Sequence, residues 1–180
     1  MISKKIILTG SFGVGKTSLF NQFMYSEFSD KYLTTFGVKV NSKIINTSNG
    51  GIKLYVWDIA GEISQDKIPM SYFLGAGGIV YVLDATRPNN EVNVSADLHF
   101  LKRILPDCKI TIVANKKDLL TPEALARLSS ETPIEWDYLT SAKTGENVEI
   151  LFTDLAEYFI EQAVVSVSGV KYQESALLFA

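Results

Sequence analysis

Short apolar runs recur along the chain, separated by segments of more mixed composition. The runs at 5–9, 78–84 and 109–114 are almost continuously apolar and rich in isoleucine and valine. Strands buried on both faces, in the middle of a parallel sheet, have this pattern. A further run at 134–139 predicts the last strand of the same sheet.

Two other segments alternate apolar and polar residues. Residues 38–47 and 52–58 follow this period of two, and Asn49-Gly50-Gly51 stands between them. A glycine-containing turn between alternating segments is typical of a β-hairpin. One of the six predicted strands is therefore expected to run antiparallel to the rest.

Apolar residues at helical spacing lie between the strands. Helices are predicted over 16–25, over 94–105 and from Asn147 onward. Two short helices are also predicted, one that ends before Gly75 and one that starts at Thr121. Strands that alternate with helices are typical of a doubly wound α/β domain. We therefore expect a six-stranded, mostly parallel sheet with about five helices, placed on both of its faces.

The chain has 180 residues, of which 47% are hydrophobic, enough for one domain with a substantial core. We expect that domain to span 1–166. The tail, 167–180, has no clear period, and the sequence leaves open whether it packs on the domain or frays. Polar residues that include Asp97, Lys102 and Arg103 predict a solvated face on the helix at 94–105.

Charge and cysteine content narrow the class of protein. The net charge of −3 argues against the electrostatic footprint of a nucleic-acid-binding protein. The single cysteine, Cys108, cannot form an internal disulfide, and no apolar run approaches 18 residues. We therefore expect a cytoplasmic protein.

Residues 10–17 read Gly-Ser-Phe-Gly-Val-Gly-Lys-Thr, between the first predicted strand and the first predicted helix. A glycine-rich loop in this context lets backbone N–H groups and the helix N-terminus face a phosphate. Lys16 would bridge the β- and γ-phosphates, and the Thr17 hydroxyl would ligate Mg²⁺. The alternative is a glycine-rich turn that holds no ligand. The predicted phosphate contacts are Gly13, Val14, Gly15, Lys16, Thr17 and Ser18.

The tetrad Asn115-Lys116-Lys117-Asp118 follows a predicted strand. It would place Asp118 where the base of a bound nucleotide could lie. The Asp118 carboxylate can accept two hydrogen bonds from guanine N1–H and its 2-amino group, whereas adenine would leave it unpaired. Lys116 would lay its alkyl stem on the base, and Asn115 would tie this loop to the phosphate loop. In Ser141-Ala142-Lys143, the Ala142 N–H would donate to guanine O6. Taken alone, the tetrad could be a surface turn.

Five motifs of this chain resemble the guanine-nucleotide motifs of the Ras superfamily, over about residues 4–165. Trp57-Asp58-x-Ala60-Gly61 is most similar to the Rab branch. The resemblance implies a P-loop NTPase G domain that acts as a molecular switch, with Mg²⁺ as cofactor and GTP and GDP as substrate and product. The motifs are Gly10 to Thr17, Thr35-Phe36-Gly37, Asp58-Ile59-Ala60-Gly61, Asn115 to Asp118, and Ser141-Ala142-Lys143.

The resemblance also assigns roles to single residues. Thr35 would ligate Mg²⁺ only when a γ-phosphate is present, with Thr34 as the rival for that role. Asp58 would hold the metal through water, and the Gly61 N–H would contact the γ-phosphate. Loss of that phosphate would release the two segments that carry Thr35 and Gly61.

Partners are implied as well. Effector, exchange-factor and activating proteins would bind the two switch segments, residues 26–37 and 59–75. Phe28, in the first of them, matches an aromatic residue that packs edge-on against guanine, although it could instead anchor the loop in the core.

Two residues depart from the family pattern. The resemblance implies four residues in catalysis: Lys16, Thr35, Gly61 and Glu62. Glu62 stands where the family usually has a glutamine, which orients the water that attacks the γ-phosphate. A carboxylate cannot donate to the transferring phosphoryl group, and its charge repels the γ-phosphate. Phe12 stands where a small residue is usual. Our hypothesis is that GTP hydrolysis is slow.

The sequence leaves three functions open. The first is a monomeric GTPase switch that hydrolyses GTP slowly, and the second is a non-hydrolysing GTP-binding interaction protein held in one state. The third, a P-loop ATPase or kinase, disagrees with Asn115 to Asp118. The tail carries no cysteine and only Lys171 as a basic residue, so no lipid anchor is evident.

Overall fold

The computed structural model describes residues 1–29, 35, 37–61, 65–87, 91–131 and 134–177. For 91–93, 129–131 and 166–177 it describes the backbone alone. The first switch segment is therefore described at its two ends and at Thr35, and the second lacks Glu62 to Ser64.

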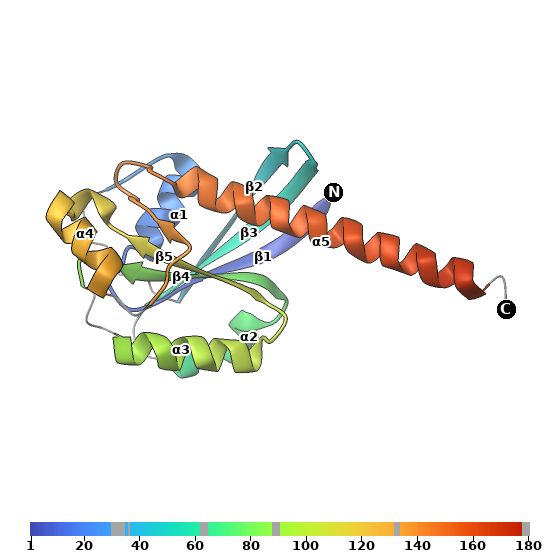
Figure 1. Ribbon diagram of the computed structural model, residues 1–180, viewed down its shortest axis with the longest axis horizontal. Coiled ribbons are helices and arrows are strands. Elements are labelled where there is room, and N and C mark those ends of the chain that lie inside the picture. The colour runs from blue at the N-terminus through green and yellow to red at the C-terminus, as the bar shows by residue number, and fades with distance from the viewer. Residues whose placement is uncertain (30–34, 36, 62–64, 88–90, 132–133, 178–180) are drawn as a thin grey trace.

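A six-stranded sheet forms the centre of the molecule, with the strand order β2-β3-β1-β4-β5-β6. β2 pairs antiparallel with β3, and every other neighbouring pair is parallel. The predicted hairpin and mixed sheet are thus confirmed (Figure 1). The strands are β1 (Ile2–Thr9), β2 (Val38–Thr47), β3 (Gly50–Ile59), β4 (Ala76–Asp84), β5 (Lys109–Asn115) and β6 (Tyr138–Leu139).

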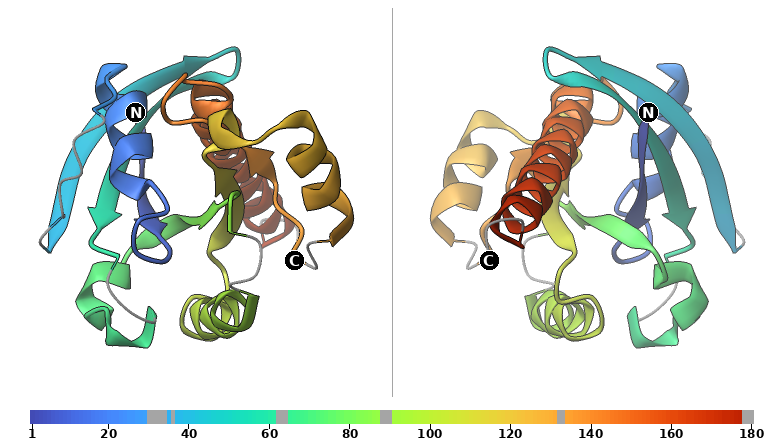
Figure 2. Two further views of the ribbon diagram at one scale, coloured as in Figure 1. Left: turned by 90° about the vertical axis from the view of Figure 1, so that its left-hand side faces the viewer. Right: turned by 90° about the vertical axis from the view of Figure 1, so that its right-hand side faces the viewer.

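Helices cover both faces of the sheet, as predicted (Figure 2). α1 and α5 pack on one face, α2 and α3 on the other, and α4 lies beside β5 and β6. Two short 3-10 turns, η1 and η2, complete the elements of the part of the chain that the structure describes. The helices and 3-10 turns are α1 (Lys16–Tyr25), η1 (Gln65–Lys67), α2 (Met70–Phe73), α3 (Glu91–Ile104), η2 (Lys117–Leu119), α4 (Pro122–Glu131) and α5 (Val148–Leu177).

β1 shows why the central strands read as continuous apolar runs. Ile6 and Leu8 point into the core beneath α1 and α5, whereas Ile7 between them points into the core beneath α3. All three side chains are fully buried. Successive side chains of a strand face opposite sides, so a strand covered on both faces needs apolar residues at every position.

Three predicted boundaries change in the structure. The strand expected over 134–139 keeps only two residues, because the Asp137 carboxylate accepts the Ile112 N–H at 2.7 Å just before β6. α4 is longer than the brief helix predicted from Thr121, whose hydroxyl accepts the Ala124 N–H at its start.

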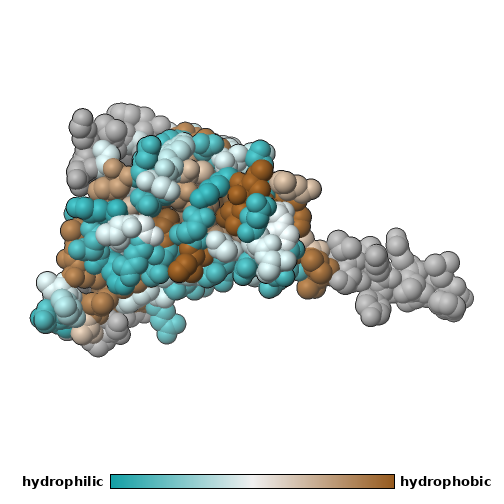
Figure 3. Space-filling model, turned by 90° about the horizontal axis from the view of Figure 1, so that it is seen from above, coloured by the Kyte–Doolittle hydropathy of each residue, from teal (hydrophilic) through white to brown (hydrophobic). Residues whose placement is uncertain are grey.

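The third change is in the tail. Residues 167–177 continue α5, which extends past the end of the sheet (Figure 1). Val164 and Val165 are 59% and 66% exposed, and hydrophobic surface lies where α5 leaves the body (Figure 3). Among the described residues, no helix combines the length and the apolar character that crossing a bilayer requires.

Asp97 corrects a further prediction. The polar pattern of α3 placed it on a solvated face, but its side chain is buried between α3, η1 and β4. Helical periodicity cannot anticipate this position, since the group that covers it comes from a different segment of the chain.

Candidate functional site

The loop between β1 and α1 has a backbone that only glycine adopts readily. Gly10, Gly13 and Gly15 have φ values of +132°, +77° and +97°. A Cβ on Gly10 would lie 2.2 Å from the Val82 carbonyl oxygen, and one on Gly15 would lie 2.4 Å from Asn115 Nδ2. The glycines are therefore required both for the turn and for the close approach of neighbouring strands.

Lys16 begins α1 and points back into this loop. Its Nζ donates to the carbonyl oxygens of Gly10 at 2.9 Å and Ser11 at 2.8 Å, and the residue is only 6% exposed. Burial lowers the pKa of Lys16 to about 8, although the Asp58 charge acts in the opposite direction. The group stays largely protonated at neutral pH, as a phosphate-binding lysine must.

Three oxygen-bearing side chains meet beside Lys16. The Thr17 hydroxyl donates to Asp58 Oδ2 at 2.6 Å and lies 2.7 Å from the Thr35 hydroxyl. Since Thr17 has one hydroxyl proton, Thr35 is the donor of the second bond. The structure thus brings together the predicted metal residues from α1, β3 and the first switch segment. Thr34, the rival of Thr35, lies outside the described residues.

Asp58 keeps one unpaired oxygen. The residue is fully buried, and its Oδ1 has no hydrogen-bond partner among the described residues. Burial raises the pKa of Asp58, while the hydrogen bond from Thr17 and the charge of Lys16 act against this shift. A buried carboxylate oxygen without a donor is costly, and a metal-bound water could supply that donor. Hydroxyl and carboxylate oxygens also suit Mg²⁺, so these residues fit the cofactor.

Gly61 closes the site from the second switch segment. A Cβ built on it would lie 2.0 Å from Lys16 Nζ and 2.9 Å from the Ser11 carbonyl oxygen. The backbone of residue 61 therefore lies directly against the phosphate-loop lysine. Its neighbour Glu62 falls outside the described residues, so the structure does not test its predicted role.

Asn115 joins the phosphate loop to the loops that follow β5 and β6. Its Nδ2 donates to the Val14 carbonyl oxygen at 3.1 Å, and its Oδ1 accepts from the Thr140 hydroxyl at 3.2 Å. The same oxygen accepts the Ala142 N–H at 3.0 Å. The expected contact of that N–H with guanine O6 stays a prediction.

Asp118 and Ser141 form a pair at the far end of the site. The Ser141 hydroxyl donates to Asp118 Oδ1 at 2.6 Å and accepts the Thr144 N–H at 3.1 Å. This orients the carboxylate predicted to read the base. Phe28 lies at the same end, where Lys143 Nζ is 5.9 Å from the centre of its ring. Ser18, in the first turn of α1, is half-buried.

Sequence reasoning gave Asp84, at the end of β4, no role in the site. It binds Lys116 Nζ at 2.7 Å, and Arg87 Nε lies 3.5 Å from the same oxygen. Burial alone would raise the pKa of Asp84, but hydrogen bonds from Lys116 and Thr86 outweigh it and lower that pKa. Asp84 thus anchors Lys116, whose stem passes 4.0 Å from a Cβ built on Gly15. A polar residue at the carboxyl end of a parallel strand was the available signal.

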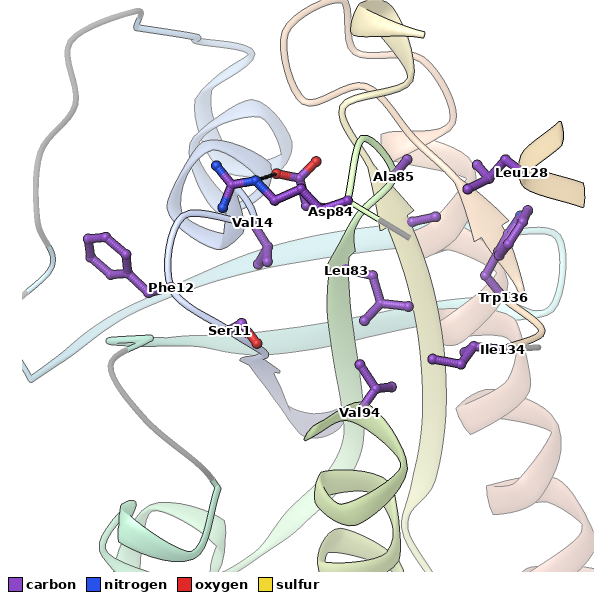
Figure 4. Close-up of a pocket in the computed structure, with 12 residues that line it drawn as sticks. Ser11, Phe12, Val14, Leu83, Asp84, Ala85, Val94, Leu128, Ile134 and Trp136 are labelled. Atoms are coloured by element: carbon purple, nitrogen blue, oxygen red, sulfur yellow. Dashed lines mark ion pairs between the residues drawn. The ribbon is translucent and has the colours of Figure 1, made fainter. Parts of the chain in front are cut away.

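An apolar cavity of about 50 Å³ lies behind the phosphate loop, between β4, α3 and α4 (Figure 4). Leu83, Val94 and Trp136 are among its lining residues, and neither Lys16 nor Thr17 takes part. The ring of Phe12 points away from this cavity in Figure 4 and is 51% exposed. The cavity thus borders the phosphate loop through Ser11 and Val14, but its lining does not include Lys16, Thr17 or Asp58.

Comparison with known proteins agrees with this geometry. The model of the Ras family matches residues 5–161. The chain belongs to the Ras family. This Ras-family protein is 33% identical to Ras-related protein Rab-4A of Bos taurus over 186 aligned residues, which cover 96% of its own length and 85% of the relative. It is 32% identical to Rab-4A of Homo sapiens, with the same coverage. The Rab-4A of Danio rerio is also 32% identical, with 96% and 87% covered.

Family membership makes the protein a small GTPase of the Rab-like type, with a guanine nucleotide as its general ligand. The resemblance to the Ras superfamily and its Rab branch is thus confirmed, as is the G-domain fold.

Proposed function

We propose that this protein binds GTP and GDP with Mg²⁺ and hydrolyses GTP slowly, as a molecular switch. The proposal rests on one observation: the side chains of Thr17, Thr35 and Asp58 lie together next to the buried Lys16. One oxygen of the Asp58 carboxylate has no hydrogen-bond partner among the described residues. These residues would hold Mg²⁺, which would neutralise charge on the β- and γ-phosphates. Asp118, oriented by Ser141, would accept the guanine edge at the other end.

Each residue would contribute to phosphoryl transfer by position and charge. Lys16 would exchange the carbonyl oxygens of Gly10 and Ser11 for phosphate oxygens, and the Gly61 N–H would donate to the γ-phosphate. The Gly61 N–H would act only on the γ-phosphate, which GTP has and GDP lacks, whereas Lys16 would also contact the β-phosphate of GDP. The segments that carry Thr35 and Gly61 would therefore respond to hydrolysis, and effector, exchange and activating proteins would read them.

The slow rate rests on Glu62 and Phe12. A carboxylate can accept a hydrogen bond from the attacking water, but it repels the γ-phosphate and cannot donate to it. The segment 26–37 contains no arginine to stabilise the transition state in cis. An activator's arginine is worth on the order of 10³–10⁵ in rate, and the exposed ring of Phe12 would obstruct its approach.

The second candidate is a GTP-binding protein that does not hydrolyse and stays in one state. Glu62 and Phe12 favour this candidate as well.

We further propose that residues 1–166 form the G domain, with 167–180 as an appended tail. The protein would work in the cytoplasm as a monomer.

Identification of the nucleotide that co-purifies with the protein tests the proposal. Denaturing the pure protein should release guanosine phosphates, GDP if the protein hydrolyses and GTP if it does not. Release of adenosine phosphates would contradict the assignment of Asp118. Direct titration with GDP and ADP, in Mg²⁺ and then in EDTA, would show base preference and metal dependence independently of what co-purifies.

A further inference from the structure

A buried chain of hydrogen bonds connects the second switch segment to α3. The Gln65 backbone N–H donates to Asp97 Oδ1 at 3.2 Å, and the Tyr81 hydroxyl donates to Asp97 Oδ2 at 2.6 Å. The Thr9 hydroxyl donates to Gln65 Oε1. All four residues are buried, with Asp97 the most accessible at 6% exposed. The chain joins β1, η1, α3 and β4.

Asp97 is held by neutral donors. Among the described residues no ion pair includes it, and its two oxygens accept hydrogen bonds from the Tyr81 hydroxyl and the Gln65 N–H. Burial, together with the neighbouring Asp97, raises the pKa of Tyr81, which keeps the phenol protonated and able to donate. A buried carboxylate needs a donor for each oxygen, so movement of Gln65 away from α3 would leave Oδ1 unsatisfied.

Two neighbouring members of this hydrogen-bonded chain, Gln65 and Thr9, are close in sequence to residues of the phosphate site. Gln65 follows Gly61 by four positions, and Gly61 lies against Lys16. Thr9 directly precedes Gly10, whose carbonyl oxygen accepts Lys16 Nζ. Asp97 holds a backbone N–H of η1, so it fixes the path of the chain rather than one side chain.

We propose that Asp97 is a positioning residue for the γ-phosphate: it fastens η1 to α3 and so keeps the backbone of Gly61 against Lys16, where the Gly61 N–H would reach the γ-phosphate. This rests on the proposed function. Because the Gly61 contact would be made to the γ-phosphate alone, loss of the fastening weakens GTP binding and leaves GDP binding almost unchanged. A residue that served only the stability of the core would change both affinities by the same factor.

The test compares Asp97→Asn with Asp107→Asn, which removes the same charge from an exposed position after α3. The affinities for a non-hydrolysable GTP analogue and for GDP are measured by titration in Mg²⁺. Hydrogen exchange of the amides from 65 to 68 is followed in parallel. Tyr81→Phe removes one donor to Asp97 and carries the same comparison if Asp97→Asn does not fold.

In Asp97→Asn, we expect the ratio of GTP-analogue to GDP affinity to fall about tenfold, with faster exchange at Gln65. Tyr81→Phe should lower the ratio about threefold, and Asp107→Asn should leave it unchanged. Equal loss of both affinities in Asp97→Asn, or an unchanged ratio in Tyr81→Phe, would overturn the role of Asp97 while the proposed function stands. A wild-type protein that binds neither nucleotide would instead refute the proposed function, and this inference with it.

Discussion

The Thr17 hydroxyl donates a 2.6 Å hydrogen bond to Asp58 Oδ2 across 41 positions of sequence. This bond ties the start of α1 to the end of β3 and satisfies one carboxylate oxygen, while Oδ1 stays unpaired among the described residues. The pair therefore combines a rigid arrangement with an open acceptor. Preorganised oxygen ligands of this kind bind a metal without a large reorganisation cost.

Asp58→Asn tests this metal site. The amide keeps the size of the side chain but removes the charge and one acceptor, so Mg²⁺ should no longer strengthen nucleotide binding. We expect GDP affinity in Mg²⁺ to fall tenfold or more, about 1.4 kcal/mol at least, and affinity in EDTA to change little. Titrations in Mg²⁺ and in EDTA measure both values, with Asp107→Asn as the control for lost charge. Equal losses in the two media would argue against a metal role.

Gly61→Ala tests the contact between the second switch segment and the phosphate loop. The added Cβ would lie 2.0 Å from Lys16 Nζ, so either the lysine or the backbone at 61 must move. We expect GTP turnover to fall by about tenfold or more, with GDP affinity changed far less. Single-turnover hydrolysis and GDP titration measure the two effects. Gly51→Ala, in the β2–β3 hairpin, is the matched control, and equal behaviour of the two variants would refute the contact.

Much of this site could be predicted from sequence because its parts are local. The backbone of residues 10–17 is determined by its own glycines, so the pattern alone predicts the turn and the place of Lys16. Asn115 ends β5 and Ser141 comes shortly after β6 in the same sheet, and parallel strands bring their carboxyl ends together.

Asp97 could not be predicted in the same way. Its position in α3 reads as polar and exposed, and the donors that make burial tolerable come from β4 and from η1. Asp84 is a similar case, since its partner Lys116 belongs to the loop after β5. Periodicity describes one element at a time, whereas these positions depend on which elements meet.

Asp118→Ala tests how the base is read. Asp118 Oδ1 accepts the Ser141 hydroxyl, which holds the carboxylate in one orientation. Loss of two charge-assisted hydrogen bonds to guanine should lower GDP affinity by about 100-fold and leave ADP affinity unaltered. Ser141→Ala should cost only a few-fold, since the carboxylate remains. Competition between GDP and ADP measures the preference, and a preference that survives Asp118→Ala would disprove the assignment.

The pH dependence of binding follows from Lys16. Its pKa is lowered to about 8 by burial, so the free protein loses this proton as pH rises through 8. A bound phosphate favours the protonated form and raises that pKa again. Binding then takes up a proton above pH 8, and GDP affinity must fall as pH rises.

We expect GDP affinity to be about fourfold weaker at pH 8.5 than at pH 7. Titration calorimetry in buffers of different ionisation enthalpy would measure the proton uptake directly. Lys16→Gln should bind more weakly and show a flatter profile over the same range. An equally steep profile in that variant would assign the pH dependence to another group.

Glu62→Gln and Phe12→Gly separate the two candidate functions. Glutamine can donate to the transferring phosphoryl group and carries no charge, so Glu62→Gln should raise single-turnover GTP hydrolysis by about tenfold or more. Phe12→Gly removes the side chain of a phosphate-loop residue that is 51% exposed, and it should raise the rate, most clearly when an activating protein is present. Each variant is compared with wild type at saturating GTP, and GDP affinity serves as the check that the site is intact. If both substitutions leave the rate unchanged or lower it, these residues do not limit hydrolysis.

A wild-type rate no higher than that of GTP in buffer, with GTP recovered from the purified protein, would favour the non-hydrolysing protein held in one state.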